Sequence, residues 1–110
     1  MAYDEGLAQR IRELLENADI SYDEKRMFGG LAFMVNGNMC VGVISTQLMA
    51  RVGANAYDQA LHQLYVEEMD FTGKPLKGFV YVSAEGIEAD EDLQGWIQRC
   101  HDFVLTLPSK

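Results

Sequence analysis

The sequence is poor in cysteine and in basic residues, and it contains no long apolar run. Two cysteines, Cys40 and Cys100, are too few for the disulfide framework of a small secreted domain, so we expect two reduced, buried thiols. No apolar stretch approaches the roughly 20 residues that a membrane-spanning helix needs. The acidic segment 1–5 also lacks the positive charge of a secretory signal. We therefore expect a cytoplasmic protein.

The scarcity of basic residues excludes two classes of partner. Nine Lys and Arg residues stand against 17 Asp and Glu residues, which gives a formal net charge of −8. Proteins that bind the nucleic-acid backbone or an anionic membrane need clustered positive charge. We expect no direct nucleic-acid binding and no membrane partner.

Apolar residues, by contrast, are plentiful. They make up 48% of the 110 residues, enough for one compact core that forms without a metal or disulfides. No internal repeat, low-complexity tract or linker divides the chain. We expect a single domain over residues 1–110, with no cofactor and no metal site.

Two segments in the first two thirds of the chain have the apolar spacing of amphipathic helices. The first covers residues 4–17, where Asp4 is a suitable N-cap. The second covers roughly 56–64, with Asn55 as its N-cap and Leu64 among the residues that face inward.

A third helix is predicted near the C-terminus. Asp90 is its expected N-cap, and Pro108 is the residue expected to stop it. Its apolar stripe consists of Leu93, Trp96, Ile97, Cys100, Val104 and Leu107. We therefore expect Trp96 to be a core residue.

The clearest strand signal is a hairpin. The apolar runs 31–35 and 39–44 flank Asn36-Gly37-Asn38, and Asn-Gly between two such runs is typical of a tight hairpin turn. Further extended segments are expected at 48–52, 66–71 and 79–82, and at 20–28 as a short edge strand or loop. The prediction is an α+β fold: an antiparallel sheet of about four to five strands flanked by N-terminal, middle and C-terminal helices.

Both faces of this sheet are apolar. One face is predicted to present Phe33, Val35, Val41 and Val43, and the other Met34, Cys40, Ile44 and Val80. Three helices of this length can cover one face. An uncovered remainder would expose more apolar surface than a monomer usually shows, so we expect a homodimer. The methionines Met27, Met34, Met39 and Met49 are interpreted as core filler.

Several blocks of the sequence resemble a known family. They are Arg26-Met27-Phe28-Gly29-Gly30 before the hairpin, segments 48–53 and 69–82, and Leu93 with Trp96-Ile97. Together they resemble the N-terminal domain of the TfoX/Sxy competence-regulator family over nearly the whole chain. The resemblance implies an antiparallel sheet flanked by helices, and it implies no catalytic site.

Longer regulators of this kind have a second, helical C-terminal domain of a type associated with DNA contact. This sequence ends at Lys110, where the first domain closes. The expectation is therefore a stand-alone domain without a direct DNA-binding role.

One group of residues is a candidate ligand site. Paired glycine amides beside an arginine can form a small anion-binding nest, and nearby cations would add to it. The candidate residues are Arg26, Gly29, Gly30, Arg51, Lys74 and Lys77. The alternative reading is that both glycines serve backbone geometry and that the lysines belong to a solvated turn.

Other motifs are rejected. Gly73-Lys74 is followed by Pro75 and lacks the spacing of a P-loop. A nucleophilic Cys40 with His62 or His101 would need a reactive thiol, but an apolar strand suppresses thiol reactivity. The carboxylates Glu67, Glu68 and Asp70 fit a charged surface turn better than a catalytic pair.

Two functions remain. The first is a non-enzymatic regulatory or protein-interaction domain with no catalytic residues. The alternative is a small anionic-ligand binder or enzyme that uses a basic pocket around the Met-Phe-Gly-Gly motif. Convergence of the six candidate residues would favour the second, whereas their dispersal beside a broad apolar surface would favour the first.

Overall fold

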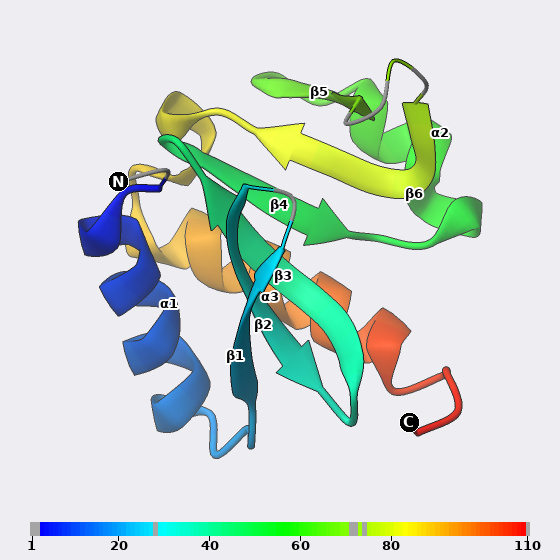
Figure 1. Cartoon of the computed structure of the whole chain (residues 1–110). Helices are drawn as coiled ribbons and strands as arrows, with labels where there is room; N and C mark the ends of the chain where they lie inside the picture. The colour runs from blue at the N-terminus through cyan, green and yellow to red at the C-terminus, as the bar shows by residue number, and fades with distance from the viewer. Residues whose placement is uncertain (1–2, 28, 71–72, 74, 110) are drawn as a thin grey trace.

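A computed structural model describes residues 3–27, 29–70, 73 and 75–109 of the chain. It shows an α+β fold in which a twisted antiparallel sheet packs against three α-helices (Figure 1). The helices are α1 (Glu5–Asn17), α2 (Ala54–Leu61) and α3 (Asp90–Val104), and a 3₁₀ helix η1 covers Ala84–Ile87. The strands are β1 (Asp23–Met27), β2 (Gly30–Val35), β3 (Asn38–Ile44), β4 (Gln47–Arg51), β5 (Val66–Asp70) and β6 (Pro75–Val82).

The sheet has six strands in the order β1-β2-β3-β4-β6-β5, and every neighbouring pair is antiparallel. It is wider than the predicted four to five strands because segment 20–28, left open between a strand and a loop, contains the edge strand β1, while the expected extended segment 66–71 contains the other edge strand, β5. The hairpin between β2 and β3 is confirmed. Asn36 and Gly37 both have positive φ, at 55° and 80°, as a tight turn of this kind requires.

All three helices pack on one face of the sheet, and together they form the helix-side core. Its largest fully buried side chains include Phe33, Ile11, Leu15, Leu48 and Leu93. In α3, five members of the predicted stripe are confirmed, since Leu93, Trp96, Ile97, Cys100 and Val104 are buried in this core. The sixth, Leu107, lies beyond the end of the helix and is half-buried. Figure 1 shows α3 crossing behind β3 while α1 lies to one side.

The opposite face of the sheet has its own apolar cluster, which we call the methionine face. Its buried members are Ala32, Met39, Met49 and Met69, and its partly buried members are Met27, Met34, Ile44, Leu76, Phe79 and Tyr81. All of them belong to strands. The sheet is strongly twisted, and Figure 1 shows β6 running across the direction of β1. The twist curves this face, so its side chains pack against one another.

Two residues lie on a different face from the one predicted. Cys40 and Val80 are in the helix-side core. The register explains Cys40: Phe33 pairs with Val41 but Met34 pairs with Met39, so Cys40 is an extra residue in β3. A bulge of this kind reverses the alternation of side chains along the strand, which sequence periodicity does not reveal.

Several element boundaries also differ from the prediction. Asp4 caps α1 as expected and accepts a hydrogen bond from the Gly6 amide at 2.9 Å. The N-cap of α2 is Gly53 rather than Asn55, and that of α3 is Ala89 rather than Asp90. Helix α3 ends at Val104, before Pro108 is reached. Within the described ranges, no helix is long and apolar enough to cross a membrane.

Candidate binding surfaces

The structure separates the basic residues of the predicted ligand site. Arg26 is exposed on the edge strand β1, Arg51 is near the end of β4, and Lys77 is exposed on β6. Because β2 and β3 lie between β1 and β4, Arg26 is about 14 Å from Arg51 across the sheet alone. Lys77 is two residues from Phe79, the register partner of Arg51. Lys74 lies outside the described residues.

Arg51 has contacts that account for its position. Its guanidinium carbon is 5.2 Å from the ring centre of Phe79 and 5.8 Å from that of Phe103, and its Nη1 donates to the Met39 carbonyl at 3.4 Å. Both rings offer cation–π contacts to the half-buried charge. Arg51 therefore joins the end of the sheet to the C-terminal part of α3.

Gly29 and Gly30 are both required by backbone geometry. Gly29 has a φ of 76°, which side-chain-bearing residues rarely adopt. A Cβ at Gly30 would run into the carbonyl oxygen of Val43 on the neighbouring part of the sheet. These constraints support the geometric reading of the pair, and a ligand role for the six residues stays a prediction.

The cysteines have the environment of inert thiols. Cys40 and Cys100 are free and fully buried. Burial raises the pKa of Cys40 to about 12 and raises that of Cys100 well above its ordinary value. His62, the suggested partner, is exposed at the end of α2, with its Nδ1 2.7 Å from the Asp58 carbonyl oxygen. Within the described residues, no group of His, Cys, Asp and Glu could hold a metal ion.

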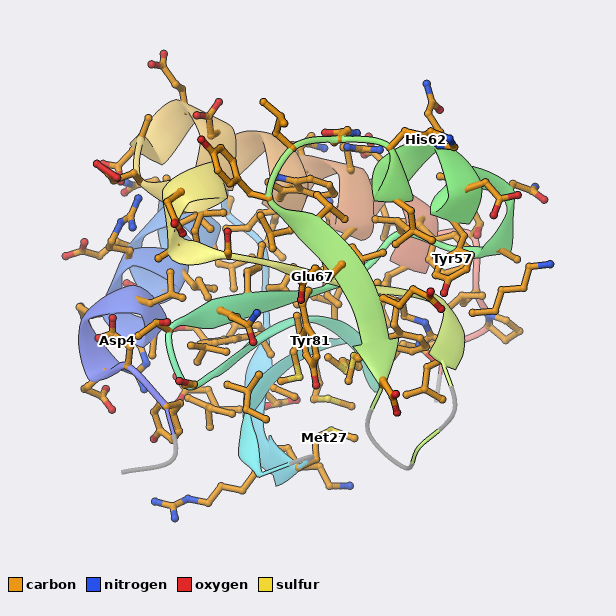
Figure 2. All side chains as sticks on the ribbon, turned by 90° about the horizontal axis from the view of Figure 1, so that it is seen from above. Asp4, Met27, Tyr57, His62, Glu67 and Tyr81 are labelled. Carbon is orange, nitrogen blue, oxygen red and sulfur yellow. The ribbon has the colours of Figure 1, made fainter. Side chains whose placement is uncertain are left out.

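The methionine face is the first candidate binding surface. Six apolar side chains at its surface are only partly buried, and no helix of the described chain packs over them. Figure 2 shows Tyr81 and Met27 on the side of the sheet away from α3, with sulfur atoms gathered near them. Burial, followed by the charge of Asp70, raises the pKa of Tyr81.

Charged side chains lie at both edges of this face. Lys25 on β1 pairs with Ala32, and Glu67 on β5 pairs with Tyr81, so both side chains share the face of their partners. Figure 2 shows Glu67 beside Tyr81. Asp23 on β1 pairs with Met34 and shares the face as well. The face therefore has an apolar centre, Lys25 and Asp23 along β1, and Glu67 on β5.

A groove between the α2–β5 loop, η1 and α3 is the second candidate surface, and we call it the Trp96 groove. Its volume is about 660 Å³. It is lined by Gln63, Leu64, Tyr65, Glu85, Gly86, Glu91, Asp92, Gly95, Trp96 and Arg99. Trp96 is only 6% exposed, as predicted for a core residue, and the Arg99 guanidinium is 4.5 Å from its ring centre.

The sequence prediction missed this groove because it placed Leu64 inward. Helix α2 ends at Leu61, three residues earlier than predicted, so Leu64 is 81% exposed. Tyr65 next to it is 50% exposed and has a φ of 67°. The available signal was the pair of large apolar residues, Leu64 and Tyr65, that follows the polar residues His62 and Gln63 after the helix.

Most of the chain matches the model of a known family. The family model described as TfoX N-terminal domain matches residues 13–104. No curated protein matches the sequence. The matched segment runs from within α1 to the last residue of α3, and so includes the whole six-stranded sheet. The chain belongs to the TfoX N-terminal domain family.

Proposed function

We propose that this domain is a non-enzymatic protein-interaction domain that acts in a cytoplasmic regulatory setting and pairs with a second copy of itself through the methionine face. The observation that supports it is the apolar, helix-free face of the sheet. Six of its apolar side chains remain partly accessible, and an apolar patch that solvent can reach on a small domain usually marks a contact surface. The proposal includes no nucleic-acid partner, because a net charge of −8 repels phosphates.

The side chains of this face suit an adaptable contact. Met27 and Met34 are unbranched, flexible and partly accessible, and Met39, Met49 and Met69 are buried in the same cluster. Methionine fits irregular surfaces without a large cost in strain. A second copy can therefore be accommodated by small changes of side-chain conformation, without movement of the strands.

The edge charges favour a second copy as the occupant. A two-fold axis parallel to the strands, in front of the middle of the face, would lay β1 of one copy against β5 of the other. Lys25 would then approach Glu67 of the second copy, and the symmetry would form this pair twice. The register of both residues with members of the methionine face supports this arrangement.

Light scattering over a concentration series tests the proposal. We expect a dimer of moderate affinity, with a dissociation constant of roughly tens of micromolar. The substitution Met34→Glu should give a monomer, because it places a charge inside the apolar contact. Gln59→Glu, which adds the same charge on the exposed side of α2, is the matched control and should leave the dimer intact.

A charge exchange adds a specific readout. Lys25→Glu and Glu67→Lys should each weaken the dimer several-fold, and the double variant should restore it, since the pair is re-formed with reversed charges. Far-UV circular dichroism checks that each variant is folded. A wild-type protein that stays monomeric at about 500 μM would contradict the proposal.

The binding of a small anionic ligand has no comparable support. The separation of Arg26 from Arg51, together with the aromatic contacts of Arg51, argues against a single pocket that includes both arginines. Titration with inorganic phosphate, followed by calorimetry, would test this alternative.

A further inference from the structure

We propose that the Trp96 groove is a second interaction site, which binds a basic segment of a different protein by an aliphatic or aromatic anchor placed beside Leu64, Tyr65 and Trp96. The groove is on the helix side of the molecule and shares no residue with the methionine face. The inference is therefore independent of the proposed dimer.

The apolar part of the groove is unusually exposed. Leu64 is 81% exposed, and Tyr65 is 50% exposed. The other exposed large apolar residue of the described chain is Leu105, which does not line the groove. Two adjacent large side chains beside a buried tryptophan provide the kind of anchor point on which interfaces depend.

The backbone holds Tyr65 in place. Tyr65 has a φ of 67°, a conformation that costs free energy for a residue with a side chain. Its carbonyl accepts a hydrogen bond from the Ser83 amide at 2.9 Å, and Gly86 provides the space beside it, where a Cβ would be 3.0 Å from the Tyr65 Cβ. The ring is thus presented to the groove by contacts with the segment that leads into η1.

The charges around the groove determine the chemistry of the partner. Its lining includes three exposed carboxylates, Glu85, Glu91 and Asp92, and a single cation, Arg99. The three carboxylates form no ion pair with any residue in the described ranges. Arg99 stacks on Trp96, so its charge lies over the ring. The groove therefore has two negative charges in excess and fits a segment with Lys or Arg beside its anchor.

The position of Trp96 supplies a direct readout. Trp96 is the single tryptophan of the chain, and it lines the groove, so its fluorescence reports on occupancy. The probe is a synthetic amphipathic peptide of leucine and lysine, and the comparison peptide has glutamate in place of each lysine. We expect saturable quenching or a spectral shift with the lysine peptide only, and an affinity that falls as salt is added.

Four variants locate the binding. Leu64→Ser should weaken binding at least about 10-fold because the anchor contact is lost, and Leu105→Ser is the matched control that should leave it unchanged. Glu91→Gln combined with Asp92→Asn should weaken binding and reduce its salt dependence. Glu88→Gln, an exposed carboxylate outside the lining, should have little effect. Leu64 and Leu105 are exposed, so neither serine variant should impair folding.

Three outcomes would overturn the inference. Equal binding of the lysine and glutamate peptides would show non-specific apolar contact. An equal loss of affinity for the lysine peptide in the Leu64→Ser and Leu105→Ser variants would place the site elsewhere. Binding of the lysine peptide that does not saturate would show that the groove takes no basic segment. Met34→Glu, which addresses the dimer, should bind the lysine peptide as wild type does, so failure of either proposal can be recognised separately.

Discussion

The two faces of the sheet bury apolar side chains of different kinds. The helix-side core contains leucine, isoleucine, valine, aromatic residues and both cysteines, but none of the methionines that the structure describes. The methionine face contains all five of them. Branched and aromatic side chains with few rotamers specify how helices pack on a sheet, whereas methionine adapts to a contact that forms and dissociates. Under the proposed function, the helix-side core stabilises the fold and the methionine face forms the contact with a second copy.

The helix-side core should be the more sensitive of the two to truncation. Trp96→Ala removes a side chain that is only 6% exposed, together with its contact to Arg99. We expect the free energy of unfolding to fall by about 3–5 kcal/mol. Denaturant titration followed by circular dichroism measures this loss. If the free energy of unfolding fell by less than about 1 kcal/mol, Trp96 would contribute little to the stability of the core and would serve mainly to line the groove.

The methionine face should tolerate a change of shape better than a loss of volume. Met49 is fully buried there, so Met49→Ala should cost about 2–5 kcal/mol. Met49→Leu keeps the volume and should cost less than about 1.5 kcal/mol. The same denaturant titration compares the two variants. If Met49→Leu lowered the free energy of unfolding as much as Met49→Ala does, this face would be as specifically packed as the helix-side core.

The sequence predicted much of the fold because the relevant signals were local. The apolar stripe of α3 and the Asn36-Gly37 turn depend on spacing over a few residues, and both were confirmed. The extra residue at Cys40 could not be predicted, since a bulge depends on the register between two strands. The same register pairs Met39 with Met34, which lies with it on the methionine face.

Long-range contacts limited the prediction of the candidate sites. Arg10 joins α1 to the segment before α3, since its Nη2 donates to the Ile87 carbonyl at 2.8 Å and to Asp90 at 2.9 Å. No pattern along the chain indicates such a pairing. The exposure of Leu64 was also hidden, because the end of α2 depends on how the following loop packs against η1.

The thiols of the helix-side core should make stability sensitive to alkaline pH. The pKa of Cys40 is raised to about 12 in the folded protein, above its ordinary value of 9.0. Since the folded state holds this proton more tightly, the free energy of unfolding should be constant below about pH 8.5 and should fall as the unfolded chain loses the proton. Urea titrations between pH 7 and pH 10 measure how steeply the free energy of unfolding falls with pH, and Cys40→Ala should make this slope smaller. Tyrosine ordinarily titrates near pH 10, above the ordinary range of cysteine, so an unchanged slope in that variant would contradict the assignment to Cys40.

The sulfur atoms of the two faces should also differ in their reaction with peroxide. Met27 and Met34 are partly buried at the surface of the methionine face, whereas Met39, Met49 and Met69 are at most 5% exposed. Exposure controls the oxidation of methionine to the sulfoxide, and burial keeps both cysteines protonated and slow to react. Among the five methionines in the described ranges, mild hydrogen peroxide should therefore modify Met27 and Met34 first, as peptide mass spectrometry can measure. If those two residues contact a second copy, a sample kept concentrated enough to dimerise should be oxidised more slowly at both positions than a dilute one. Equal rates at the two concentrations would show that the methionine face remains open to solvent in the assembled protein.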